Sequence, residues 1–222
     1  MGTFAEQVSE ALQWLRDAAS RLTIRGDRAP IDTAERLFEF VSTRAALITQ
    51  KKLYGYLKER MGIRYPEMFE DPVFARSIDL AKMQVFAASL SDLTIHAVAQ
   101  VQGQGGLQPS ERDRLARACY ESGLADNSDN LPDPLAPAAW RAAFDRRVDE
   151  TNWANVAAGA SAFVESPKAL VRWAPIAEEK KRHDREIVEN SIRFAWNEVI
   201  ADLRERLDAE AVARSWLDRA GA

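Results

Sequence analysis

The chain has 222 residues, 46% of them hydrophobic, and a formal net charge of −4 from 30 basic and 34 acidic side chains. This composition excludes a predominantly disordered chain and allows one sizeable core, or at most two small ones. The single cysteine, Cys119, excludes a disulfide scaffold and indicates a reducing compartment. The slight acidic excess gives no strong nucleic-acid signal.

Residues 1–31 are predicted to form an amphipathic helix followed by a linker. Thr3 and Glu6 fit a capping box at the start of this helix. Its polar face mixes acidic and basic side chains, which favours docking to a protein partner or to the rest of the bundle over binding to lipid. The start of the chain contains no apolar signal-peptide segment, so we expect a cytoplasmic protein. The apolar residues of the predicted helix recur at helical spacing: Phe4, Val8, Leu12, Leu15, Ala19 and Leu22.

Residues 32–125 are predicted to contain the central helices. The most apolar stretch runs from Met83 to Val101 and approaches the length of a membrane span. Because it also contains several polar side chains, a central helix of a bundle is the better interpretation, and we expect no transmembrane segment. Helical spacing predicts helices over residues 32–62, 72–102 and 110–123, with a flexible glycine-rich break at residues 103–106.

Residues 126–137 contain three prolines and two asparagines and form the strongest predicted loop. The C-terminal helices are expected in residues 138–222, including a long one from Pro175 toward Leu207. No segment alternates apolar and polar residues convincingly, so no strand is expected. The sequence therefore predicts a single all-α domain over residues 1–222, a bundle of about six to seven helices of which three are long.

Asp92 and His96 interrupt the apolar central helix. They lie four residues apart, so both side chains share one helix face and can touch. A carboxylate beside an imidazole raises the pKa of the histidine and fixes its tautomer, as a general base or a metal ligand requires. The alternative is a hydrogen-bonded polar pair that sets the register of the helix inside the bundle.

The start of the last long helix is a second polar interruption. Extending its apolar stripe backward reaches His183 and Asp184, where core residues are expected. One interpretation is a polar pocket in which His183 and Asp184 are catalytic candidates and Lys180, Arg185 and Glu186 are further candidates. The other is a solvated, salt-bridged helix end, because residues 178–186 contain four acidic side chains and four lysines or arginines.

Metal binding is a possibility that the sequence supports poorly. Asp92 with His96, and Glu179 with His183 and Glu186, place potential ligands at one-turn spacings on two long helices. The chain contains only two histidines and no Glu-x-x-His pair, which the di-iron pattern of helical bundles requires. We therefore predict no metal and no cofactor.

Motifs of nucleophilic hydrolysis are equally weak. The segment closest to a Gly-x-Ser-x-Gly elbow is residues 159–163, which contains Ser161 but ends in Phe163 rather than glycine, and no strand precedes it. Cys119 lies on an amphipathic helix and has the character of a small core residue rather than a reactive thiol. No phosphate-binding loop is present either.

A basic and aromatic stretch runs over residues 51–65. Its side chains suit phosphates or a nucleic-acid strand, and the candidates are Lys51, Lys52, Tyr54 and Lys58. Alternatively, Tyr54 belongs to the core stripe, and the lysines are its solvated flank.

Residues 48–82 and 166–196 resemble an uncharacterised family of helical proteins from alphaproteobacteria, whose members are often described as esterases. The resemblance covers about a third of the chain and points to a bacterial protein. It implies no established activity and no catalytic residue, so none is transferred. The missing elbow motif is a departure from what an esterase requires.

The leading hypothesis from the sequence is a non-enzymatic helical protein that binds a macromolecular partner, with a protein as the expected partner. One alternative is an esterase-like hydrolase that uses His96 or His183 as base and a serine or Cys119 as nucleophile. Another is a bundle that binds a small ligand or a lipid. The relative position of the two histidines separates most of these alternatives.

Overall fold

The computed structural model describes residues 28–62, 65, 69–127 and 136–220. Within these ranges the chain forms eight helices and no β-strand, and they pack into one body. The all-α prediction is therefore confirmed. The amphipathic helix expected in residues 1–31 falls almost entirely outside the described residues, as does most of the proline-rich loop at residues 126–137.

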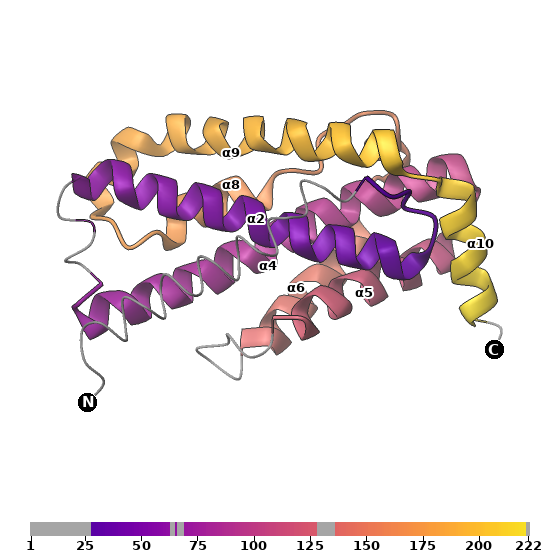
Figure 1. Cartoon of the computed structure of the whole chain (residues 1–222), viewed down its shortest axis with the longest axis horizontal. Helices are drawn as coiled ribbons and strands as arrows, with labels where there is room; N and C mark the ends of the chain where they lie inside the picture. Colours follow the sequence, from indigo (N-terminus) through magenta and orange to yellow (C-terminus); the bar gives the residue numbers. More distant parts are fainter. Residues whose placement is uncertain (1–27, 63–64, 66–68, 128–135, 221–222) are drawn as a thin grey trace.

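Three helices are long, as predicted, and they run lengthwise through the molecule (Figure 1). They are α2 (Ala34–Met61), α4 (Pro72–Gly105) and α9 (Glu178–Arg206). The shorter helices are α5 (Pro109–Ala125), α6 (Ala136–Glu150), α7 (Trp153–Ala157), α8 (Glu165–Trp173) and α10 (Ala209–Ala220).

Helix α4 is the central element of the bundle. It packs against α2, α5, α6, α7, α8 and α10, which is why it tolerates apolar residues on nearly every side. Asp71 caps its N-terminus by accepting a hydrogen bond from the backbone N–H of Val73 at 2.8 Å, and Pro72 follows in the first turn. Across the described residues, no helix combines the length and the apolar character that a membrane crossing needs.

The glycine-rich segment 103–106 is not the flexible break that the sequence predicted. Helix α4 continues through Gly105 and ends at Gly106, which adopts a left-handed conformation with φ of 69°. A Cβ atom at Gly105 would lie 2.5 Å from the carbonyl oxygen of Ala209. The glycine therefore serves close packing of α4 against the start of α10, which overrides its low helix propensity.

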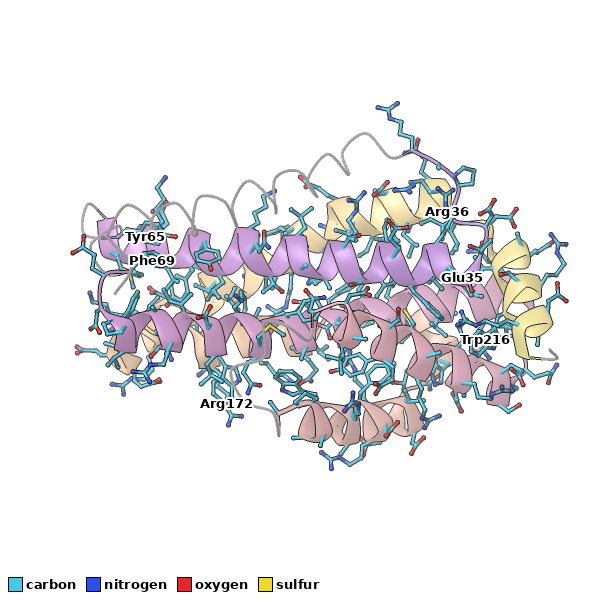
Figure 2. The ribbon with its side chains drawn as sticks, turned by 60° about the horizontal axis from the view of Figure 1, so that its bottom comes forward. Glu35, Arg36, Tyr65, Phe69, Arg172 and Trp216 are labelled. Carbon is cyan, nitrogen blue, oxygen red and sulfur yellow. The ribbon has the colours of Figure 1, made fainter. Side chains whose placement is uncertain are left out.

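The two ends of the described chain meet at one end of the bundle. The backbone N–H of Ile31 donates a hydrogen bond to the carbonyl oxygen of Arg206 at 2.8 Å. The backbone N–H of Asp208 donates to the carbonyl oxygen of Ile31 at 3.0 Å. Helix α10, which the sequence did not predict, crosses this end and places Trp216 against Phe38 with ring centroids 6.4 Å apart. Figure 2 shows Trp216 at this end, beside Glu35, and an aromatic pair at the opposite end.

That aromatic pair consists of Tyr65 and Phe69, whose rings meet edge to face at 5.1 Å (Figure 2). Phe69 also stacks on Tyr54 of α2 and meets Phe74 of α4. These contacts close the end of the bundle where α2 and α4 are connected.

Candidate functional site

Asp92 is fully buried on α4 and bonds to the start of α8. Its carboxylate accepts hydrogen bonds from the backbone N–H groups of Glu165 and Ser166, at 3.1 and 2.8 Å, and from the Ser166 hydroxyl at 2.6 Å. Helix α8 has no side-chain cap at Val164, so Asp92 supplies the cap from another helix. Ser166 itself lies in the first turn of α8.

Arg147 of α6 is the counter-charge of Asp92. Its guanidinium lies 2.8 Å from the carboxylate and also donates to the Ser91 hydroxyl at 2.7 Å and to the carbonyl oxygen of Ala162 at 2.5 Å. Burial raises the pKa of Asp92, and the Arg147 charge and the hydrogen bonds from α8 oppose that rise. The network joins α4, α6 and α8, and no motif in the sequence marks Arg147 as its cation.

Trp196 connects this network to an adjacent cavity. The indole N–H of Trp196 donates to the Ser166 hydroxyl at 3.0 Å, so both hydrogen-bonding functions of that hydroxyl are used within the protein. The Trp196 ring stacks on Phe163, with centroids 4.8 Å apart. Both residues line the cavity, and the hydrogen bond to Ser166 fixes the Trp196 ring in this aromatic part of the wall.

His96 also contacts Phe163, with ring centroids 5.3 Å apart. Although His96 is one turn from Asp92, the Asp92 carboxylate is engaged by α8 and Arg147, so the predicted carboxylate–imidazole pair does not form. Burial and the positive charge of Arg204 lower the pKa of His96 to about 4. The imidazole is therefore neutral at pH 7, and its ring nitrogens have no hydrogen-bond partner within the described part of the chain.

His96, Phe163 and Trp196 line a cavity of about 600 Å³ between α4, α9 and the segment that connects α7 to α8. We call it the His96 cavity. Its polar side chains come from three segments: Gln100 and Gln104 from α4, Ser161 from the connecting segment, and Arg193, Asn197 and Arg204 from α9. Aliphatic side chains complete the wall: Ile200, Leu203 and Leu207.

The charged groups of the His96 cavity are two arginines of α9. Arg193 is paired with Glu189 at 2.9 Å and with the side-chain oxygen of Asn190 at 3.0 Å. Arg204 forms no ion pair with any described residue. Burial is the larger cause of the low pKa of His96, and the charge of Arg204 adds to it, because a nearby cation disfavours protonation of the imidazole. The same field attracts an anion.

A second cavity, of about 670 Å³, lies between α4, α5, α6 and α7. The charged side chains that line this second cavity mostly interact with other side chains of its lining. Arg112 bonds to Asp113 at 2.6 Å and lies over the Trp153 ring, 4.7 Å from the centroid. This cavity therefore offers a ligand fewer free polar groups than the His96 cavity does.

The polar start of α9 does not reach either cavity. His183, Lys180, Arg185 and Glu186 are exposed, and His183 precedes the first cavity residue, Arg193, by ten positions, or about 15 Å of helix. The two histidines therefore do not converge on one site.

Asp184 alone among the α9 candidates is buried. It accepts a hydrogen bond from the Tyr56 hydroxyl at 2.8 Å and a two-pronged ion pair from Arg60 of α2. Lys181 is also buried, and its ammonium group donates to the carbonyl oxygen of Arg172 and to Glu178. These groups tie α9 to α2 and α8 and leave no open polar pocket around Asp184.

The predicted basic and aromatic patch on α2 is divided between core and surface. Tyr54 packs against Phe69, and burial raises the pKa of its hydroxyl. Lys52 donates to Ser191 of α9 at 2.9 Å, Lys51 lies 3.8 Å from Glu198, and Lys58 is exposed. Both Lys51 and Lys52 thus face α9, so the four side chains do not form one continuous binding surface.

The last two candidates for chemistry are a reactive thiol at Cys119 and a metal site. Cys119 is buried, and burial raises the pKa of its thiol to about 12, which keeps it protonated at neutral pH. Over the described ranges, no three histidine, cysteine or acidic side chains come close enough to hold a metal ion.

A scan against protein-family models found no match to the chain, and neither did comparisons with curated proteins and with solved structures.

Proposed function

We propose that the protein binds a small organic anion in the His96 cavity. The observation that carries this proposal is the arrangement of Arg204 beside a neutral imidazole and an aromatic wall in a cavity of about 600 Å³. This volume lies in the range of cavities that hold metabolite-sized ligands. The sequence left small-ligand binding open as an alternative, and the lining of the His96 cavity supports it.

The side chains of the cavity define the ligand. Phe163 and Trp196 form an aromatic part of the wall, which suits a ring or another planar group. The amides of Gln100, Gln104 and Asn197 can donate and accept hydrogen bonds, and Arg204 supplies a cation. A compound with a planar apolar body and one carboxylate or phosphate group matches this combination.

Ester hydrolysis is a second candidate, favoured by one observation: Ser161 and His96 line the same cavity. Two features weaken it. An imidazole with a pKa of about 4 is a weak general base at neutral pH, and Asp92 is not available to orient it. The Ser161 oxygen also accepts a hydrogen bond from the backbone N–H of Phe163 at 3.2 Å. If hydrolysis occurs, Ser161→Ala abolishes the turnover of p-nitrophenyl esters.

The binding proposal is tested by thermal denaturation of the full chain with a panel of aromatic and aliphatic carboxylates and phosphates. A ligand at about 100 times its dissociation constant adds about 2.7 kcal/mol of stability, which raises the melting temperature by about 5 to 10 °C. Arg204→Gln should remove this shift. The matched control is Arg182→Gln, because Arg182 is an exposed arginine of the same helix outside the cavity.

Two results would overturn the proposal. One is a panel in which no anion stabilises the protein. The other is a stabilising anion whose effect is the same in Arg204→Gln and in the wild-type chain. The hypothesis of a macromolecular partner rested on the missing catalytic motifs, on the amphipathic helix expected in residues 1–31 and on the polar start of the last long helix. It stays a prediction, and residues 1–27 lie outside the described residues.

A further inference from the structure

Helix α9 carries a second apolar row on the side that faces away from the bundle. Its inner side is buried through residues such as Ile192, Val199 and Leu203. On its outer side Ile187 is 75% exposed and Phe194 is 71% exposed, and Ala201 is exposed as well.

These three outer residues follow one another at intervals of seven. A spacing of seven residues returns to nearly the same face of an α-helix, so they form one row. Helix α9 lies along an edge of the bundle, as Figure 1 shows, so a partner can approach this row. We call Ile187, Phe194 and Ala201 the outer row.

We infer that the outer row is the interface of a two-fold symmetric dimer, in which α9 packs antiparallel against α9 of a second copy of this chain. A two-fold axis at Phe194 brings the two Phe194 rings together. Ile187 of one protomer then faces Ala201 of its partner, because both lie seven positions from Phe194. The large side chain thus meets the small one on both sides of the axis.

The charges along the same face support the antiparallel arrangement. Lys180 lies at the N-terminal end of the face, next to Glu179, and Glu205 lies toward its C-terminal end, two turns beyond Glu198, which pairs with Lys51. His183 and Glu205 are each eleven positions from Phe194, so the two-fold axis places them opposite one another, with Lys180 one turn away. A parallel pairing would instead place like charges together, which costs binding energy.

The size of the contact predicts a weak dimer. From His183 to Glu205 the face extends about 33 Å, long enough for a helix–helix contact, but each protomer contributes only two large apolar side chains. A contact with so few large apolar side chains buries less surface area than most specific protein–protein interfaces. We therefore expect a dimer that dissociates on dilution.

Sedimentation equilibrium of the full chain over a range of concentrations tests the dimer. The wild-type chain should show a reversible monomer–dimer equilibrium, and Phe194→Glu should weaken it by roughly thirtyfold, because it places two carboxylates at the centre of the contact. The matched control is Val73→Glu, since Val73 is 65% exposed on α4 and lies outside the interface. A wild-type chain that is monomeric at every concentration would overturn the inference.

Charge exchange tests the direction of the pairing. Lys180→Glu and Glu205→Lys should each weaken the dimer, and the double variant should restore it. Restoration requires that the two positions lie within about one helical turn of each other across the interface. A double variant that is weaker than both single variants would contradict the antiparallel arrangement.

Cysteine cross-linking tests the register. The native Cys119 is buried, so introduced cysteines are read without interference. Phe194→Cys should form a disulfide-linked dimer under mild oxidation. Ile187→Cys should not do so alone, because the two copies of residue 187 are 14 positions apart along the paired helices, but the combination with Ala201→Cys should cross-link. If Phe194→Cys instead forms an intramolecular disulfide with Leu15→Cys, the N-terminal segment occupies the outer row and the dimer is wrong.

Discussion

Asp92 and Ser166 are joined by two hydrogen bonds although 74 residues separate them in the chain. The backbone N–H and the hydroxyl of Ser166 both donate to the same carboxylate oxygen, at 2.8 and 2.6 Å. Through this contact a side chain of the central helix fixes the start of α8. Since Trp196 in turn donates to Ser166, the contact also positions one wall of the His96 cavity.

Asp92→Ala should destabilise the protein by about 3–5 kcal/mol, because it leaves the guanidinium of Arg147 largely buried without its counter-charge. Chemical denaturation measures this change in the free energy of unfolding. The control is Asp145→Ala, which removes a more exposed partner of Arg117 and should cost less than about 1 kcal/mol. Equal effects of the two substitutions would contradict the structural role of Asp92.

The pH dependence of stability should contain a contribution from His96. Its pKa is about 4 in the folded protein, below the ordinary value of 6.5, so the unfolded chain binds the proton more tightly. Stability is therefore full above about pH 6.5 and falls by about 3 kcal/mol as the pH drops to about 4. His96→Gln should remove this part of the pH dependence, and the exposed His183→Gln should leave it in place. A wild-type stability that is flat between pH 6.5 and 4 would contradict the low pKa.

Arg204→Gln should raise the pKa of His96, because the arginine charge is one of the two causes that lower it. A bound anion should act in the same direction by offsetting that charge. The chain contains only two histidines, so an NMR titration can follow each imidazole separately. Arg182→Gln serves as the control and should leave the His96 titration unchanged. An unaltered pKa in Arg204→Gln would show that Arg204 does not act on the imidazole.

Two glycines of long helices should respond in opposite ways to alanine. Gly105→Ala should destabilise the protein by about 1–3 kcal/mol, because its Cβ would lie 2.5 Å from the Ala209 carbonyl oxygen. Gly55→Ala should stabilise it by up to about 1 kcal/mol, since nothing lies within 4 Å of the added Cβ on α2. Thermal denaturation of both variants measures the difference. A stabilising Gly105→Ala would mean that α10 does not pack closely on α4.

The spacing of apolar residues predicted the three long helices better than it predicted where helices end. The three long helices follow from apolar residues at helical spacing, and the apolar stripe of α9 is buried through Ile192, Val199 and Leu203. The break expected at residues 103–106 was wrong, because glycine propensity is a local property and the contact of Gly105 with Ala209 is not. Helix α10 was missed altogether.

The candidate site shows the same division. Backward extension of the α9 stripe reached His183 and Asp184 and left open whether this end of the helix faces a pocket or solvent. In the structure His183 is exposed and Asp184 is buried. Whether that position was a pocket or an internal ion pair depended on Arg60, which lies 124 residues earlier on another helix. Likewise, the shared face of Asp92 and His96 was visible in their spacing, but their different partners were not.

The sequence by itself determined that this protein is an all-α bundle with three long helices, and which faces of those helices are apolar, because both follow from a periodicity that neighbouring residues carry. Only the tertiary structure decided that Asp92 caps α8 and pairs with Arg147, and that His96, Phe163, Trp196 and Arg204 line one cavity. Those contacts join residues dozens of positions apart on different helices. Their formation depends on how the helices pack, and that packing leaves no local pattern in a single sequence.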